Sequence, residues 1–496
     1  MKEEPLKNRI ASGLIWSYAE RFLVQAITII VSIVLARILN PKDYGTVAVV
    51  IIFISICDAL VAGGFGNALV QKKNTTDIDF DSICWLSIVI ALVLYICLFV
   101  MAPWIADFFR DELLKPVIRV MGTKFIFSAF NSVQQAYVQR KMIFRKFFFA
   151  TLGGTIFSAF MGVGMALLGM GVWALVAQQL SNTIIGTAIL FLSIDWKPKL
   201  QVSLKSIQSL WKVGSRVLAS TMVYTLKDNI RSLIIGKKFT STDLAYYNQG
   251  QKYPSLIVSD IVESLGKVLF PVLADKQDNR DVIKTLIRRS IRISSYVLTP
   301  IIAGLFAVSD TFVSAILTDK WIPCVLYMRI LCVVYVTRPI STIFQKSLLA
   351  IGKSTLTLIA EIITSGLTII LLMISVFVYN SINLIAWSYV VIMIIDVIYY
   401  AFFVHKHFSY AYKEMISDYF LPFIMSVIVG SGAYLVGMFH INVLVKLILQ
   451  ALCGGSIYLM LSNLFKVDSY YYIRGYVVSI LKKGGLSGRR GINADY

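Results

Sequence analysis

The chain has 496 residues, of which 57% are hydrophobic and 15% are charged, and its mean hydropathy is +0.75. This composition excludes an ordinary soluble domain and is typical of a polytopic membrane protein. The formal net charge is +20. Because no nucleic-acid-binding motif accompanies this charge, we expect the basic surface to contact anionic membrane lipids, and we expect no nucleic acid partner.

Apolar runs broken at turn residues and charges predict an all-α polytopic membrane protein with about fourteen transmembrane helices, at roughly 20 residues for each span. Helices are favoured over a β-barrel because the runs are continuous rather than alternating. We expect the spans at 13–38, 44–68, 83–106, 116–138, 147–169, 171–194, 209–236, 243–271, 285–308, 322–350, 354–379, 382–404, 419–439 and 441–464.

Two turns indicate an internal repeat, because LNPKDYG at 39–45 aligns with FTSTDLA at 239–245. Each follows a long span with a polar stripe and leads into another span. Two six-helix lobes would then be related by a pseudo-two-fold axis along the membrane normal, with a site between them. We expect an N-terminal lobe at 1–194, an amphipathic inner linker at 195–208, a C-terminal lobe at 209–404, two extra spans at 405–464 and a basic cytoplasmic tail at 465–496.

The distribution of Lys and Arg predicts the orientation. These residues concentrate in the connections that face inward if the N-terminus is inside, so we expect both termini to be cytoplasmic. The first apolar segment is too long for a signal peptide and is expected to remain as the first span. The six cysteines lack metal-type spacing, so we expect neither a disulfide framework nor a metal site.

Polar residues fall on one helical face in several spans. Arg216, Ser220, Lys227 and Arg231 share a stripe in span seven, and Arg21 lies in a similar stripe in span one. In span four the stripe comprises Lys124, Ser128, Asn131 and Gln135. Each such residue could form a structural ion pair or reach an interface, but aligned intramembrane cations are typical of a wet substrate path. Spans five and six carry no charged residue and are interpreted as lipid-facing scaffold.

The candidate cavity residues suit an anionic, sugar-bearing substrate. Arginine can bind phosphate through paired hydrogen bonds, and amides and hydroxyls suit sugar hydroxyls. No Walker motif, GxSxG elbow or His-carboxylate metal pattern occurs, so we expect no catalytic residues and no enzyme activity. The substrate-binding candidates are Arg21, Lys124, Asn131, Gln135, Arg216, Lys227, Arg231, Lys267 and Arg338.

The stretch GLIWSYAERFLVQAITIIVSIVLARILNPKDYGTVAVV at 13–50, together with GVWALVAQQL at 171–180, resembles the polysaccharide-transporter branch of the multidrug/oligosaccharidyl-lipid/polysaccharide (MOP) exporter superfamily. These proteins are O-antigen, colanic-acid and teichuronic-acid flippases. The resemblance implies two six-helix lobes around a cationic cavity, sometimes with two added spans. It also implies alternating-access transport of undecaprenyl-diphosphate-linked oligosaccharide across the bacterial inner membrane.

Coupling to an ion gradient is a further implication of this resemblance. Na⁺ or H⁺ would bind at an acidic residue, with Asp58, Asp260 and Glu263 as candidates, and no other cofactor is expected. Glycan polymerase or assembly proteins are possible partners. Two alternatives remain open, a multidrug exporter of the same superfamily and a non-transport scaffold of a glycan assembly complex. Cavity cations disfavour the drug exporter because they would repel amphipathic cations.

Overall fold

A computed structural model describes residues 6–62 and 64–475. Within these residues all regular elements are helical, which confirms the all-α class. Eleven helical segments of the described chain are long and apolar enough to cross a membrane. The three other expected spans correspond to α5 (Leu114–Gly122) with α6 (Lys124–Lys141), to α9 (Leu204–Lys238) and to α10 (Ser241–Asp275). These helices carry the polar stripes, so the expected count of fourteen is compatible with the structure.

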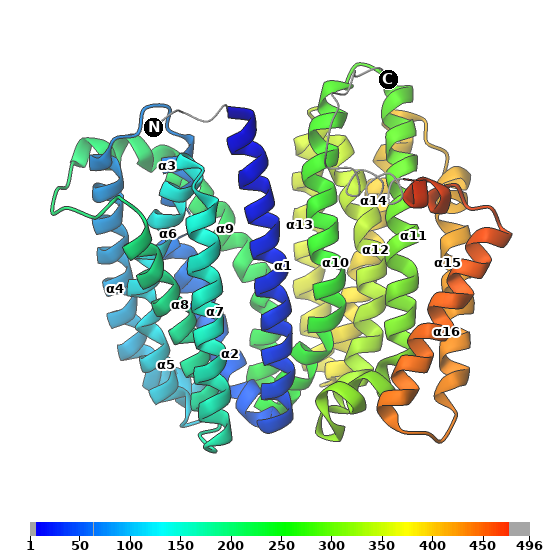
Figure 1. The fold of residues 1–496 in the computed structure, drawn as a ribbon, viewed down its shortest axis with the longest axis horizontal. Helices are drawn as coiled ribbons and strands as arrows, with labels where there is room; N and C mark the ends of the chain where they lie inside the picture. Colours follow the sequence, from blue (N-terminus) through cyan, green and yellow to red (C-terminus); the bar gives the residue numbers. More distant parts are fainter. Residues whose placement is uncertain (1–5, 63, 476–496) are drawn as a thin grey trace, which may run out of the picture. The chain divides into compact units, whose positions relative to one another are not determined.

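The described residues pack into two compact units, one ending at Asn248 and the other beginning at Gln249. In each unit the long helices run side by side (Figure 1). Besides α5, α6 and α9, the first unit contains α1 (Leu6–Ile38), α2 (Pro41–Ala62), α3 (Phe65–Gln71), α4 (Asp77–Phe109), α7 (Phe144–Leu167) and α8 (Val172–Ser193). Helix α10 begins in the first unit and continues into the second. The second unit also contains α11 (Arg280–Phe312), α12 (Cys324–Ala350), α13 (Ser354–Met373), α14 (Ile382–Phe408), α15 (Tyr412–Gly437) and α16 (Val443–Leu464).

The two turns that align in sequence use the same capping interaction. The Asn40 backbone N–H donates to Asp43 Oδ2 at 3.1 Å, and the Thr240 N–H donates to Asp243 Oδ2 at 3.1 Å. Each aspartate thereby satisfies a backbone donor where α2 and α10 begin. The turns also meet, because a Cβ placed on Gly45 would lie 1.8 Å from the carbonyl oxygen of Ser241. Only a residue without a side chain permits this approach.

A second tight turn joins α7 to α8. Gly169 and Gly171 have φ angles of +75° and +53°, which other residues adopt at a cost. The two helices then pack closely along their length, since a Cβ on Gly154 would lie 3.0 Å from the Cα of Gly186. Small residues at such contacts are typical of helix pairs in membranes.

The connection between α8 and α9 is fastened to the start of α4. Trp196 Nε1 donates to Asp81 Oδ1 at 3.0 Å, and Trp85 Nε1 donates to the Lys199 carbonyl at 2.8 Å. The Ser203 N–H donates to Ser82 Oγ at 2.9 Å. The segment predicted as an amphipathic linker therefore consists of an irregular, anchored part followed by the first turn of α9.

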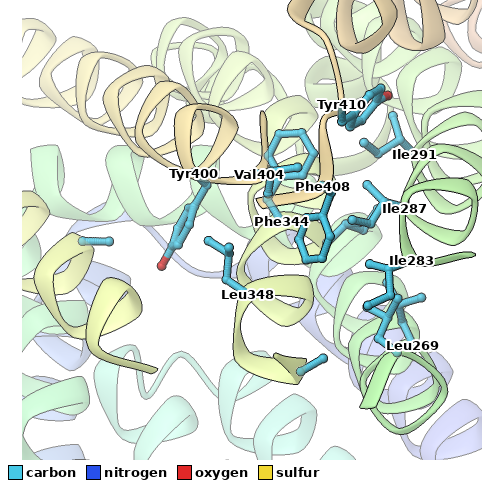
Figure 2. Packing of buried hydrophobic residues seen from close by; sticks show 14 residues of the cluster. Leu269, Ile283, Ile287, Ile291, Phe344, Leu348, Tyr400, Val404, Phe408 and Tyr410 are labelled. Atoms are coloured by element: carbon cyan, nitrogen blue, oxygen red, sulfur yellow. The ribbon is translucent and has the colours of Figure 1, made fainter. Parts of the chain in front are cut away.

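The second unit encloses an apolar core among α10, α11, α12 and α14 (Figure 2). Ile283, Ile287 and Ile291 follow one another at four-residue intervals, so they share one face of α11. That face packs in a cluster with Phe344 of α12 and Phe408 of α14. Full burial of each such side chain contributes about 1.5–3 kcal/mol.

Candidate functional site

A polar cavity of about 400 Å³ lies within the first unit. It is formed by α2, α3, α6, α7 and α8, and its wall carries five amide side chains and four hydroxyls. Such a wall is unusual among helices apolar enough to span a membrane, where polar groups are costly and usually functional. The polar lining residues are Asp58, Asn67, Ser128, Asn131, Ser132, Gln135, Gln139, Thr151, Asn182 and Thr183.

Helix α6 supplies one side of this cavity. Ser128, Asn131 and Gln135 recur every three or four residues, so they share a face, as the sequence pattern predicts. Gln135 Nε2 donates to Asn131 Oδ1 at 2.5 Å, and Asn131 Nδ2 donates to Thr187 Oγ1 at 3.3 Å. This chain of hydrogen bonds fixes the orientation of the two amides.

Lys124, at the start of α6, forms an ion pair with Asp58 of α2. The distance from Lys124 Nζ to Asp58 Oδ2 is 2.9 Å, and the two side chains are 21% and 24% exposed. The other carboxylate oxygen of Asp58 is buried and has no hydrogen-bond partner among the described residues. The structure thus joins a predicted substrate-binding cation to a predicted ion-coupling acid, and each largely neutralises the other.

Helices α7 and α8 also line the cavity, through Thr151, Asn182 and Thr183. The interpretation of these two spans as lipid-facing scaffold is therefore wrong for their inner faces. Sequence reasoning missed the three residues because it followed charges, and both helices lack charged side chains in their central parts. The polar run QQLSNT at 178–183 was the available signal for Asn182 and Thr183.

The other predicted cations of the first unit do not line this cavity. Arg231 is buried at 8% exposure within α9, and Lys227 is half-buried. Arg216 of α9 and Arg21 of α1 are exposed. The stripe in α9 therefore runs from an exposed end at Arg216 to a buried end at Arg231.

In the second unit, Lys267 and Arg338 each contact a side chain of the same unit. Lys267 Nζ lies 2.6 Å from Glu263 Oε1, one turn away on α10, and both side chains are exposed. Arg338 Nη2 donates to Tyr389 Oη at 3.2 Å. Asp260 is half-buried on α10. Since an exposed pair contributes at most about 1 kcal/mol, the Lys267–Glu263 pair adds little to the stability of the unit.

No group of three or more His, Cys, Asp or Glu side chains capable of holding a metal ion occurs among the described residues. At Oδ2 of Asp58 a lysine ammonium lies where a bound cation would sit. The amides and hydroxyls of the cavity wall offer hydrogen bonds to a ligand.

Comparison with known proteins identifies the family. Residues 34–326, more than half of the chain, match the family described as "Polysaccharide biosynthesis protein". The chain belongs to this family. It is thus a member of the polysaccharide-transporter branch of the MOP superfamily, as the resemblance in the ARILNPKDYG region predicts.

Two curated relatives cover most of the chain. The teichuronic acid biosynthesis protein TuaB of Bacillus subtilis (strain 168) is 24% identical over 97% of this chain and 99% of its own length. The lipopolysaccharide biosynthesis protein WzxC of Escherichia coli (strain K12) is 21% identical over 87% of this chain and 88% of its own. Among solved structures, the lipid II flippase MurJ in an inward closed conformation is similar in fold, with a TM-score of 0.73 at 17% identity over 92% of this chain and 99% of its own.

Proposed function

We propose that this protein is a flippase that moves undecaprenyl-diphosphate-linked oligosaccharide repeat units from the cytoplasmic to the outer leaflet of the bacterial inner membrane. The observation that carries the proposal is similarity along almost the whole chain to TuaB and WzxC, which are named for polysaccharide biosynthesis. The polar cavity among membrane-spanning helices supports it, since a glycan must exchange water for protein hydrogen bonds to cross the bilayer.

The proposed mechanism assigns the two chemical parts of the headgroup to different residues. The diphosphate would bind Arg21, Arg216, Lys227 and Arg231, because charge-assisted hydrogen bonds suit phosphate oxygens. The glycan would contact amides such as Asn131 and Gln135. Lys267 and Arg338 of the second unit would be further phosphate ligands. The lipid tail would stay in the bilayer while alternating access moves the headgroup across.

An ion gradient would drive the cycle, with Na⁺ or H⁺ as the coupling ion. Asp58, Asp260 and Glu263 are the candidate acids. Asp58 could bind a coupling ion only after its contact with Lys124 opens, and Glu263 would exchange its exposed contact with Lys267. Glycan polymerase or assembly proteins would act as partners on the outer side, and the protein itself would catalyse no covalent step.

Proteoliposomes offer a direct test. Purified protein would be reconstituted with fluorescent undecaprenyl-diphosphate oligosaccharide, and transfer between leaflets would be followed with and without Na⁺ and proton gradients. The Arg216→Ala/Lys227→Ala variant should slow transfer by about tenfold or more, because each charge-assisted hydrogen bond contributes about 1.5–3 kcal/mol. Lys205→Ala on the same helix is the matched control. Wild-type protein that inserts correctly but transfers no lipid, and instead expels amphipathic drugs, would overturn the proposal.

A further inference from the structure

We infer that the polar cavity of the first unit is a subsite for a neutral sugar of the transported glycan and that it rejects uronic acid and phosphate groups. This inference rests on the proposed flippase function and specifies which part of the headgroup the cavity takes. It separates sugar recognition, within the first unit, from recognition of the diphosphate by the arginines and lysines outside this cavity.

The hydrogen-bonding groups of the wall match a sugar. Each amide offers two N–H donors and an acceptor, and each hydroxyl offers one donor and an acceptor. The wall can therefore form hydrogen bonds with sugar hydroxyls, which both donate and accept. Phe147 adds an apolar ring surface against which the C–H face of a pyranose can pack. The amides are Asn67, Asn131, Gln135, Gln139 and Asn182.

The charge of the wall excludes anions. Asp58 is the charged residue among the described lining side chains, and Lys124 already neutralises it at 2.9 Å. A carboxylate or phosphate entering this space would lose its hydration without gaining a cation.

One hydrogen-bond acceptor of the wall, Asp58 Oδ1, indicates that the ligand carries a donor. The Oδ1 atom of Asp58 is buried without a hydrogen-bond partner among the described residues, although Asp58 belongs to the cavity lining. Such an atom is costly unless it receives a hydrogen bond. A sugar hydroxyl can donate one, whereas a deprotonated carboxylate or phosphate oxygen cannot. The volume of about 400 Å³ lies within the usual range of small-molecule pockets, which begins at about 300 Å³.

Binding of three lipids to the full-length protein in nanodiscs tests the inference. The lipids are undecaprenyl diphosphate alone, the same lipid with a glucose disaccharide, and that disaccharide lipid with its terminal glucose oxidised to glucuronate. Wild type should bind the neutral disaccharide lipid about tenfold more tightly than the bare lipid, while glucuronate should remove most of this gain. The Asn131→Ala/Gln135→Ala variant should bind the neutral disaccharide lipid no more tightly than it binds the bare lipid. Gln277→Ala, an exposed amide of the second unit, is the matched control.

The outcomes separate the subsite from the function. If Asn131→Ala/Gln135→Ala weakens binding of the neutral and bare lipids equally, the sugar subsite is overturned. It is also overturned if wild type binds the glucuronate lipid as tightly as the neutral one. Unchanged affinities in that variant would also overturn the subsite but would leave the flippase function standing. Wild-type protein that binds none of the three lipids would overturn the proposed function itself.

A gain of binding provides a second test that misfolding cannot imitate. Asp58→Asn removes the carboxylate and leaves the ammonium of Lys124 beside the cavity. This variant should bind the glucuronate lipid about tenfold more tightly than wild type does, since a charge-assisted hydrogen bond becomes available. Asp58→Asn/Lys124→Gln, which is neutral, should lose that gain. A glucuronate affinity that is the same in all three proteins would show that the ion pair does not set the selectivity.

Discussion

The guanidinium of Arg288 holds the carboxylate of Asp418 with two hydrogen bonds, from Nε to Oδ2 at 2.7 Å and from Nη2 to Oδ1 at 3.0 Å. Arg292 Nε and Tyr410 Oη each add a further bond to the same carboxylate at 2.7 Å. Burial and the bond to Asp418 raise the pKa of Tyr410, so its phenol keeps its proton. The cluster fastens α15 to α11.

Asp418→Ala should therefore loosen the attachment of α15. The Asp418 side chain is fully buried, and its removal leaves Arg288 and Arg292 without their shared acceptor. We expect a loss of about 3 kcal/mol, near the lower end for a broken buried ion pair because both arginines are partly exposed. Thermal unfolding in detergent measures it. Asp275→Ala, which breaks an exposed pair with Lys276, should change stability by less than about 1 kcal/mol; similar losses in both would contradict the assignment.

Gly45 should tolerate no side chain. A Cβ at this position would meet the Ser241 backbone, which cannot rotate away as a side chain could. Gly45→Ala should lower the midpoint of thermal unfolding by several degrees, because the starts of α2 and α10 must separate. Gly164→Ala on α7, where the added methyl meets nothing within 4 Å, should leave the midpoint unchanged or raise it slightly. Equal midpoints for Gly45→Ala and wild type would show that the two turns are free to move apart.

The Asp58–Lys124 pair predicts non-additive transport defects. Lys124→Ala leaves the Asp58 carboxylate half-buried without its cation and should slow transport by about tenfold, whereas Asp58→Ala/Lys124→Ala should recover part of the loss. A double-mutant cycle of initial transfer rates measures the coupling. A double variant that transports no better than Lys124→Ala would instead give Asp58 a direct role, such as binding the coupling ion.

Arg140 should stabilise the short helix α3 against local unfolding. Its Nη1 donates to the Val70 carbonyl at 3.1 Å and its Nη2 to the Lys73 carbonyl at 2.6 Å, so it satisfies acceptors at the end of that short helix. Arg140→Ala should increase amide hydrogen exchange at residues 65–73 about tenfold or more, since two charge-assisted hydrogen bonds are lost. Arg140→Lys should restore little of the protection from exchange, because an ammonium cannot bridge separate acceptors as a guanidinium does. Unaltered exchange in Arg140→Ala would refute this role.

The proposed orientation predicts which side of the membrane each connection faces. In a Cys97→Ser background, which removes an exposed native thiol, a cysteine at Lys42 should react with a membrane-impermeant maleimide in intact cells. A cysteine at Lys199 should react only after the membrane is permeabilised. Both positions are exposed, so access depends on sidedness. The reverse pattern would place the termini outside.

Much of the helical fold could be predicted because its signals are local. Apolar runs mark the helices, and three- and four-residue spacing places Asn131 and Gln135 on one face. The expected span 116–138 nevertheless divides into two helices at Thr123. Gly122 precedes this break, but it is a weak signal because glycine is also frequent within transmembrane helices. The pairing of Lys124 with Asp58 could not be predicted from the sequence, because it depends on how α6 packs against α2. The helical phase within one span contains no information about the neighbouring helix.

The closeness of Lys124 to Asp58 also bears on how the chain enters the membrane during synthesis. Lys124 lies in one of the polar regions that fall outside the eleven strongly apolar segments, and a lysine at mid-membrane costs about 2.5–3.5 kcal/mol on insertion scales. Helix α2 is made first, so its carboxylate is already available when α6 emerges from the ribosome. We therefore expect the acid to help keep α6 in the bilayer, so that a chain in which α6 is translated before α2 should insert less efficiently.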